Sequence, residues 1–184
     1  MAMIQSDEFR KGRDRIVRIQ DATTARLTAS DGVGVAYTTP ITAGIYLRGL
    51  ITANFSMSPN VQEFTLLGDD GYRDSVATGM AGELACSAYF TGPDDGSIDP
   101  AFQLILDAEA NRDKEIYVEV LTYIGEDSSN NHKYWARAFN SAVTGASETA
   151  AGDGLIEMSW TFQSKGQIYV GTLDSGTSKI DPFA

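Results

Sequence analysis

Cysteine and histidine are almost absent from the 184-residue chain, which contains one of each, Cys86 and His132. Disulfide frameworks require paired cysteines, and Cys/His zinc sites require more ligands than the chain holds. The G-x-S-x-G motif of a nucleophilic serine is also missing. These absences argue against the corresponding enzyme classes. We interpret His132 as a solvated loop residue and Cys86 as a small buried apolar residue.

Long apolar runs are also missing. The longest weakly charged stretch, residues 37–47, is interrupted by Pro40 and Gly44, whereas a membrane-spanning helix needs about 20 apolar residues. The first twenty residues lack the apolar core of a secretory signal. We therefore expect a soluble protein with no membrane segment that is made in a cytoplasm.

Basic residues are scarce, with 14 Lys and Arg against 25 Asp and Glu and a net charge of −11. A field of this sign repels phosphate and argues against sequence-specific binding of DNA or RNA. Residues 1–26 nevertheless carry a net charge of +2, and the remaining 158 carry −13. This segment is either a solvated terminus or an arm that docks on the acidic surface of a neighbouring copy. The predicted arm residues are Arg10, Lys11, Arg13, Arg15 and Arg18.

Motifs for cofactors and metals are incomplete. Gly32-Val33-Gly34 lacks the third glycine of a dinucleotide site, and the Asp-Asp-Gly turns at residues 69–71 and 94–96 lack the glutamate of a calcium loop. We therefore expect no cofactor, no metal and no catalytic residue. Paired carboxylates of a glycoside hydrolase would leave no spacing signature, so a carboxylate-dependent hydrolase stays open as a minor alternative.

The length favours one domain with extensions: an N-terminal arm over 1–40, a β domain over 41–174 and a tail over 175–184. Alternation with period two predicts strands over residues 44–56, 61–67, 82–91, 115–124, 134–143, 155–163 and 168–173. The first two are expected to form a hairpin through Ser58-Pro59-Asn60. Polar loops are expected over 68–80, 125–133 and 145–154. Such loops on a rigid scaffold tend to carry function.

One helix interrupts the strands. Asp99 is a good N-cap and Pro100 a good first residue, and an apolar stripe of about twelve residues follows, with Arg112 and Lys114 at its C-terminal end. The fold class that follows is mainly β: an antiparallel β-sandwich of seven to eight strands, or a strongly curved sheet, with one flanking α-helix.

The two faces of the predicted strands differ. The inward face is expected to supply the core, including Phe90, Val118, Trp160 and Phe162, together with Ile45, Leu47, Ile51 and Phe55 in the first strand and Ile156 at the start of the sixth. The helix is expected to add Phe102 to this core. The outward face carries small or acidic residues, among them Glu83, Glu119, Glu157, Ser159 and Thr161. This face has few aromatics to stack on bases. It fits a wet surface that does not adhere to nucleic acid, and equally the solvated face of any antiparallel sheet.

The order of motifs resembles the major tail tube proteins of tailed bacteriophages. The resemblance covers roughly Gly44 to Gly171 and rests on four segments: VATGMAGELACSAYF, DPAFQLILDAEANRDKEIYVEVLTYIG, YWARAFNSAVTGASE and GDGLIEMSWTFQSKGQIYVG. Tube proteins of contractile injection systems and type VI secretion share this fold. The resemblance therefore does not separate these groups.

The resemblance implies a structural virion protein without catalytic residues. Copies would form hexameric rings that stack into the hollow tail tube, located in the virion after assembly in the bacterial cytoplasm. DNA would pass through the lumen without specific binding, and partners would be other tail proteins such as the tape measure, the tail terminator and the baseplate or tip. The outward residues given above would line the lumen, and the arm would join rings. The alternative is a small β-sandwich module that binds a partner or decorates a capsid.

Overall fold

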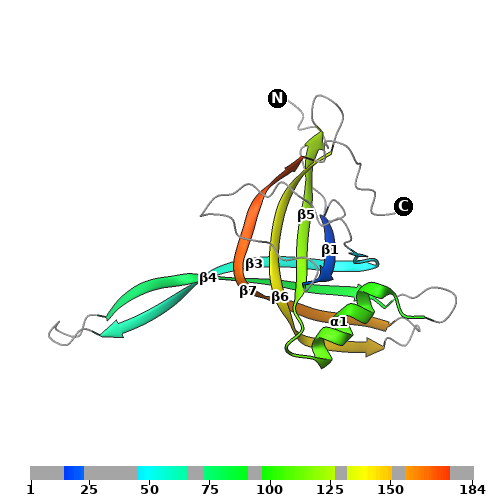
Figure 1. Ribbon diagram of the computed structural model, residues 1–184, viewed down its shortest axis with the longest axis horizontal. Helices are drawn as coiled ribbons and strands as arrows, with labels where there is room; N and C mark the ends of the chain where they lie inside the picture. The colour runs from blue at the N-terminus through cyan, green and yellow to red at the C-terminus, as the bar shows by residue number, and fades with distance from the viewer. Residues whose placement is uncertain are drawn as a thin grey trace, which may run out of the picture.

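The computed structural model describes residues 15–22, 45–65, 73–90, 97–126, 132–150 and 156–174 (Figure 1). Within these ranges it contains seven strands and one helix. They are β1 (Arg15–Asp21), β2 (Ile45–Tyr46), β3 (Leu50–Thr65), β4 (Arg73–Tyr89), α1 (Pro100–Ala110), β5 (Ile116–Glu126), β6 (His132–Ala150) and β7 (Ile156–Asp174).

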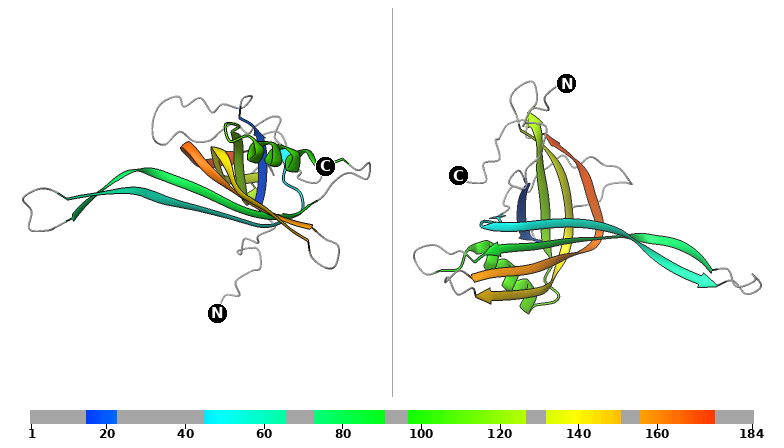
Figure 2. Two further views of the ribbon diagram at one scale, coloured as in Figure 1. Left: turned by 90° about the horizontal axis from the view of Figure 1, so that it is seen from below. Right: turned by 180° about the vertical axis from the view of Figure 1, so that it is seen from behind.

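All seven strands belong to one antiparallel sheet with the order β2-β1-β5-β6-β7-β4-β3. β6 pairs with β5 only over residues 132–141 and continues beside β7 to Ala150. A bulge between Thr144 and Ser147 interrupts the β6–β7 register, and Gly145 supplies the positive φ of 65° there. The two long strands bend, so one half of the sheet stands across the other (Figures 1 and 2).

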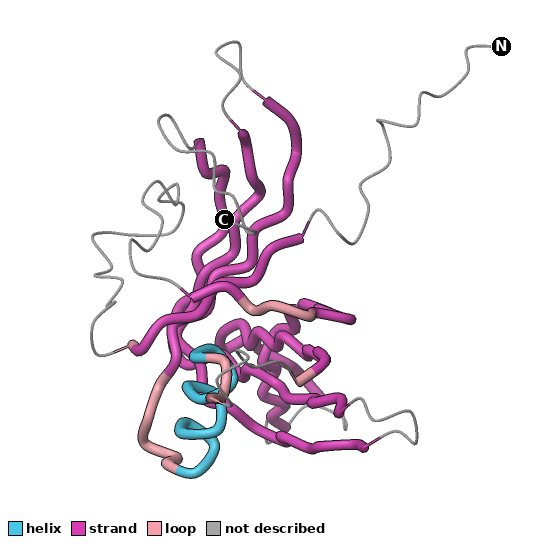
Figure 3. The backbone as a smooth tube through the Cα atoms, turned by 90° about the vertical axis from the view of Figure 1, so that its right-hand side faces the viewer, coloured by secondary structure: helices cyan, strands magenta, loops and turns pink. Residues whose placement is uncertain are grey.

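The mainly β, antiparallel fold with one flanking helix is therefore confirmed. The sandwich is made by a single curved sheet. Its upper layer contains β2, β1, β5, the first half of β6 and the second half of β7, and its lower layer contains the second half of β6, the first half of β7, β4 and β3. Figure 3 shows the two layers and the helix from the side.

The main core lies between the two layers and α1. Phe102 of the helix meets Trp160 edge-on at 5.9 Å between ring centroids, and Trp160 meets Phe162 at 6.2 Å. Phe55 of the lower layer contacts Phe139 of the upper layer at 5.7 Å. Among the five predicted core residues, four are buried, namely Phe102, Val118, Trp160 and Phe162, and Phe90 is half-buried against this core.

The helix begins as its sequence predicts. The Asp99 carboxylate accepts a hydrogen bond from the backbone N–H of Ala101 at 2.8 Å, and Pro100 occupies the first turn. The helix ends at Ala110, before Arg112 and Lys114. The prediction that these cations lie in its C-terminal part is therefore wrong, although Lys114 Nζ approaches the Asp107 carboxylate to 3.7 Å.

The strands are longer than predicted. Ser58-Pro59-Asn60 does not form a turn, because β3 continues through these residues. β3 is an edge strand, which can contain a proline because one of its two sides makes no hydrogen bonds to a neighbouring strand. The hairpin is formed by β3 and β4, which run out together from the rest of the sheet (Figure 2). Its connection lies outside the described residues. The predicted loops over 68–80 and 145–154 are partly strand, in β4 and β6.

Two predicted inward residues are exposed. Ile51 lies at a register shift between Leu50 and Thr52, and 43% of its surface is accessible. The shift places Leu50, Ala53 and Phe55 against the core instead. Ile156, the first residue of β7, is also exposed.

Trp160→Ala should lower the free energy of unfolding of the unassembled subunit by about 3–5 kcal/mol, because it leaves a cavity beside Phe102 and Phe162. Urea unfolding measures this loss. The matched control is Trp135→Ala, since Trp135 is 41% exposed and its truncation should cost clearly less than that of the buried Trp160. Equal losses for both variants would contradict the assignment of the core.

Candidate assembly surfaces

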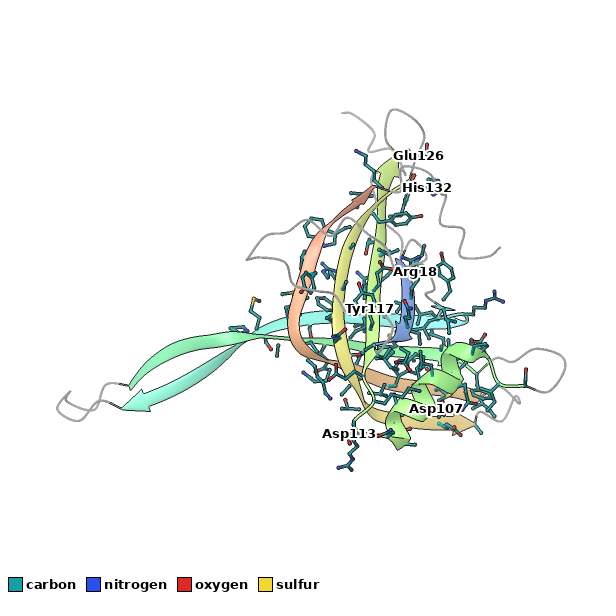
Figure 4. All side chains as sticks on the ribbon, viewed as in Figure 1. Arg18, Asp107, Asp113, Tyr117, Glu126 and His132 are labelled. Atoms are coloured by element: carbon teal, nitrogen blue, oxygen red, sulfur yellow. The ribbon has the colours of Figure 1, made fainter. Side chains whose placement is uncertain are left out.

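A buried ion pair joins β1 to β5. Arg18 and Glu119 are directly opposite in the β1–β5 register. The Nε of Arg18 donates to Oε2 of Glu119, and its second guanidinium nitrogen contacts the same oxygen. Both residues are buried, with 6% and 0% of their surface accessible. Figure 4 shows Arg18 on β1, beside β5.

This ion pair lies in a second apolar cluster, on the side of β5 that faces away from the main core. The cluster contains Tyr117, Leu121, Tyr134, Ala136, Ala138 and Ala22. The guanidinium of Arg18 also lies over the ring of Tyr46, 5.8 Å from its centroid. Two charges removed from water in this way are stable only as a pair. Arg18 and Glu119 therefore fix how β1 sits on β5.

Two sequence predictions are wrong here. Glu119 does not lie on a solvated face, because both faces of β5 are covered at that position. Arg15 and Arg18 are not part of a free arm, because they belong to β1 within the sheet. Arg10, Lys11 and Arg13 lie outside the described residues, so their role stays a prediction.

Glu119→Ala should destabilise the subunit by about 3–5 kcal/mol, because it leaves the Arg18 guanidinium buried without its counter-charge. Replacing both residues, with Arg18→Met and Glu119→Leu, should recover most of this loss. Chemical denaturation of the three variants measures the effect. The control is Glu115→Ala, which breaks an exposed pair with Lys165 at 3.4 Å and should cost under about 1 kcal/mol. A double variant no more stable than Glu119→Ala would contradict the analysis.

The lower layer presents a continuous polar face on the side opposite the main core. Cross-strand pairs place its residues in rows, such as Thr52, Ser87, Ser159 and Ser147. The positions on this face are Thr52, Asn54 and Ser56 on β3, Glu83, Ala85, Ser87 and Tyr89 on β4, Glu157, Ser159, Thr161 and Gln163 on β7, and Ala142, Thr144, Ser147 and Thr149 on β6. Four of the five predicted outward residues, all but Glu119, thus share one surface.

Eight of these fifteen positions are Ser or Thr, and the face carries a weak negative charge. Only Glu83 and Glu157 are charged among the positions just given. The hydroxyls of Thr52 and Ser87 are 2.9 Å apart, which ties β3 to β4 across the face. The alternation of small polar and apolar residues in β4 and β7 predicts this surface, and the register brings its rows together.

The lower layer also has two open edges. β3 is the last strand of the sheet, and β6 pairs only with β7 beyond Ser141 among the described residues. Within the described ranges the layer therefore consists of four antiparallel strands, in the order β6, β7, β4 and β3, and neither outer strand has a further strand beside it. Sequence reasoning did not find these edges, because they depend on where β5 leaves β6.

His132 and Cys86 have different environments. His132 begins β6, and its Nε2 lies 3.3 Å from Oε1 of Glu126, with Tyr123 and Tyr134 edge-on to its ring (Figure 4). It is therefore not a solvated loop residue as predicted. Cys86 is buried, and burial raises the pKa of its thiol to about 12 despite the nearby charge of Arg15. Such a thiol is a poor nucleophile.

The described residues contain no cluster of three or more His, Cys, Asp or Glu side chains placed to hold a metal ion. In the same ranges, no helix is long and apolar enough to span a membrane.

Structures of tail assemblies share this architecture. The chain matches a subunit of the SPP1 tail tube, determined by solid-state NMR and cryo-EM, with a TM-score of 0.58 and 15% identity over 95% of this chain and 82% of that one. The chain has the tail-tube fold. It also matches a chain of the virion of a native gene transfer agent particle, with a TM-score of 0.50 and 13% identity over 88% of this chain and 98% of that one. A chain from the tail of the empty particle, refined with C6 symmetry, matches with a TM-score of 0.50 and 14% sequence identity.

Comparisons of sequence alone do not identify a relative: no family model matches the chain, and no curated protein does. The chain therefore resembles these structures in the arrangement of its backbone and not in its sequence.

Proposed function

We propose that this chain is the structural subunit of a phage tail tube, in which six copies form a ring and rings stack into a hollow tube for genome delivery. The observation that carries the proposal is the lower layer, which combines two open edges with a small-polar, weakly acidic face. The shared fold with tail-tube structures supports the same conclusion. The chain would then lie in the virion tail, beside other tail proteins.

Ring closure follows from the number and direction of the strands. Because the lower layer has four alternating strands, β3 and β6 run in opposite directions at its two edges. The β3 edge of one copy can therefore pair antiparallel with residues 142–150 of β6 in the next copy. A closed ring of such pairs removes every open edge of this layer. The side chains of the polar face then all point to one side of the barrel.

We assign the polar face to the lumen. The apolar side of the lower layer is occupied by the main core, which leaves the face with Glu83, Glu157, Ser159 and Thr161 for the channel. Small hydroxyls give a wet wall, and Tyr89 is the one aromatic among its positions, so bases find little surface on which to stack. The two glutamates repel phosphate, so DNA would slide without specific binding.

The purified chain should form rings or hollow tubes in negative-stain images. A proline in β3 tests the proposed edge. Successive N–H groups of an edge strand point to opposite sides, so of Ala53→Pro and Asn54→Pro one removes a ladder hydrogen bond and the other removes an outward donor. The second variant should fold but fail to form rings.

Urea unfolding identifies which proline variant keeps its stability. Normal rings from that variant would contradict β3 as the ring joint. A wild-type chain that stays monodisperse and small at high concentration would contradict the proposed function and favour the module that binds a partner or decorates a capsid.

Replacing Glu83 and Glu157 together with Lys should leave tail assembly intact, because exposed strand charges usually change stability by under about 0.5 kcal/mol. Genome ejection should slow or stall, since each lysine would be repeated around every ring and attract phosphate. The experiment compares ejection from phage carrying this variant with phage carrying Glu109→Lys and Asp113→Lys, on the helix side. Ejection at the wild-type rate from tails that contain the Glu83 and Glu157 variant would place these residues outside the channel.

A further inference from the structure

The β3–β4 hairpin leaves the rest of the sheet at an angle to the upper part of β6 and β7, which rises from the core (Figures 1 and 2). We call the place where they meet the corner. Its floor is the side of the hairpin opposite the polar face, and its wall is the upper part of β6 and β7. Ile168 of β7 touches the floor, since a Cβ on Gly82 of β4 would overlap its side chain. Arg137 of β6 lies over the ring of Phe55 of β3, 5.0 Å from its centroid.

Exposed apolar side chains gather around this corner. Trp135 and Arg137 alternate with buried Ala136 and lie on the same side of β6 as Phe139 of the core. Val170 is opposite Arg137 in the register. On the floor, Met57 pairs with Gly82, and Met80 precedes it by two residues on β4. Four of the eight large apolar residues exposed among the described ones lie here, with exposed fractions of 41% for Trp135, 38% for Val170, 37% for Met57 and 55% for Met80.

The corner also holds two arginines without an acidic partner among the described side chains. Arg15 donates from its guanidinium to the carbonyl oxygen of Ala53 at 2.5 Å. Partial burial lowers the pKa of Arg137, and the positive charge of Arg15 lowers it further. Two neighbouring cations in a half-buried site repel each other, and a carboxylate that arrived there would relieve this. An ion pair formed in this way would be largely removed from water.

We propose that this corner, formed by Met57, Met80, Trp135, Arg137 and Val170 with Arg15 at its base, binds an acidic surface of a second copy of the chain. The inference rests on the proposed function and names one contact that holds the tube together.

Two observations favour a second copy as the occupant. The part of the chain after residue 26 carries a net charge of −13, so another copy offers many carboxylates to the arginines. The corner also lies on the side of the lower layer opposite the polar face, so it stays outside the channel when a ring closes, although it borders the β3 edge through Met57 and through the contact of Arg15 with Ala53. Because a cationic corner meets an acidic surface elsewhere on the next copy, the contact is head-to-tail and can repeat along a filament. Trp and Arg are the residues that most often dominate such contacts.

The test uses the full chain with Arg137→Glu and with Trp135→Ser. Both variants should raise the protein concentration needed for half-assembly at least tenfold, as measured by sedimentation velocity, and negative-stain images should show isolated rings or free subunits. Arg137→Gln should weaken assembly less and reduce its dependence on salt. The controls are Arg112→Glu and Ile98→Ser, which change an exposed cation and an exposed apolar residue away from the corner and should assemble as the wild type does.

Urea unfolding of each subunit shows whether it still folds. If Arg137→Glu does not fold, Trp135→Ser and Val170→Ser carry the test, because both side chains are exposed in the subunit. Corner variants that fold and form tubes at the wild-type concentration would overturn the inference and leave the corner for a different protein. If the wild type forms no rings or tubes, the proposed function fails. A smaller wild-type oligomer that Arg137→Glu abolishes would still support the corner, and a strictly monomeric wild type would overturn it.

Discussion

The long strands β6 and β7 belong to both layers, and every other feature depends on this sharing. Their bend lets one sheet enclose its own core, with Trp160 and Phe162 on one layer opposite Val118 and Phe139 on the other. The bulge beside Gly145 allows the β6 backbone to turn while it stays paired with β7. Where β6 leaves β5, the lower layer gains an open edge. A single geometric device thus produces the core, the polar face and one of the two joining edges.

In the upper layer, a buried ion pair between Arg18 and Glu119 holds β1 against β5. β5 has apolar residues on both faces, and Glu119 is the one charged residue in its buried stretch. Its pairing with Arg18 makes the N-terminal strand part of the folded body. This pairing also constrains alignment, because a slip of one residue would turn Arg18 toward the main core and leave Glu119 without a partner. The buried ion pair therefore adds little stability of its own, but it favours a single register between β1 and β5.

Sequence patterns correctly predicted the features that depend on residues close together in the chain. The N-cap at Asp99, the buried faces of residues 84–88 and 158–162, and the antiparallel fold class all follow from spacing of two or from helix capping. Features that depend on distant pairing were missed. The turn expected at Pro59 did not form because β4 lies beside it, and Ile51 left the core because of a register shift. Glu119 was assigned to solvent because alternation gives the side of a strand and not what covers it; the nearly continuous apolar run IYVEVLTYI was the available signal of two-sided burial.

The β1–β5 pairing has a consequence for folding during synthesis. Arg18 and Glu119 are 101 positions apart, so β1 leaves the ribosome long before its partner strand exists. At about 5–20 residues per second, the interval is roughly 5–20 seconds. During that time β1 lacks its β5 partner, and the charge of Arg18 lacks the glutamate with which it is later buried. β6 and β7, which complete the lower layer, are made later still. The β3 edge is made early, but the β6 edge that it would join is made only after residue 141. Chains still being synthesised therefore lack one of the two joining edges until late in synthesis, which delays ring contacts between copies.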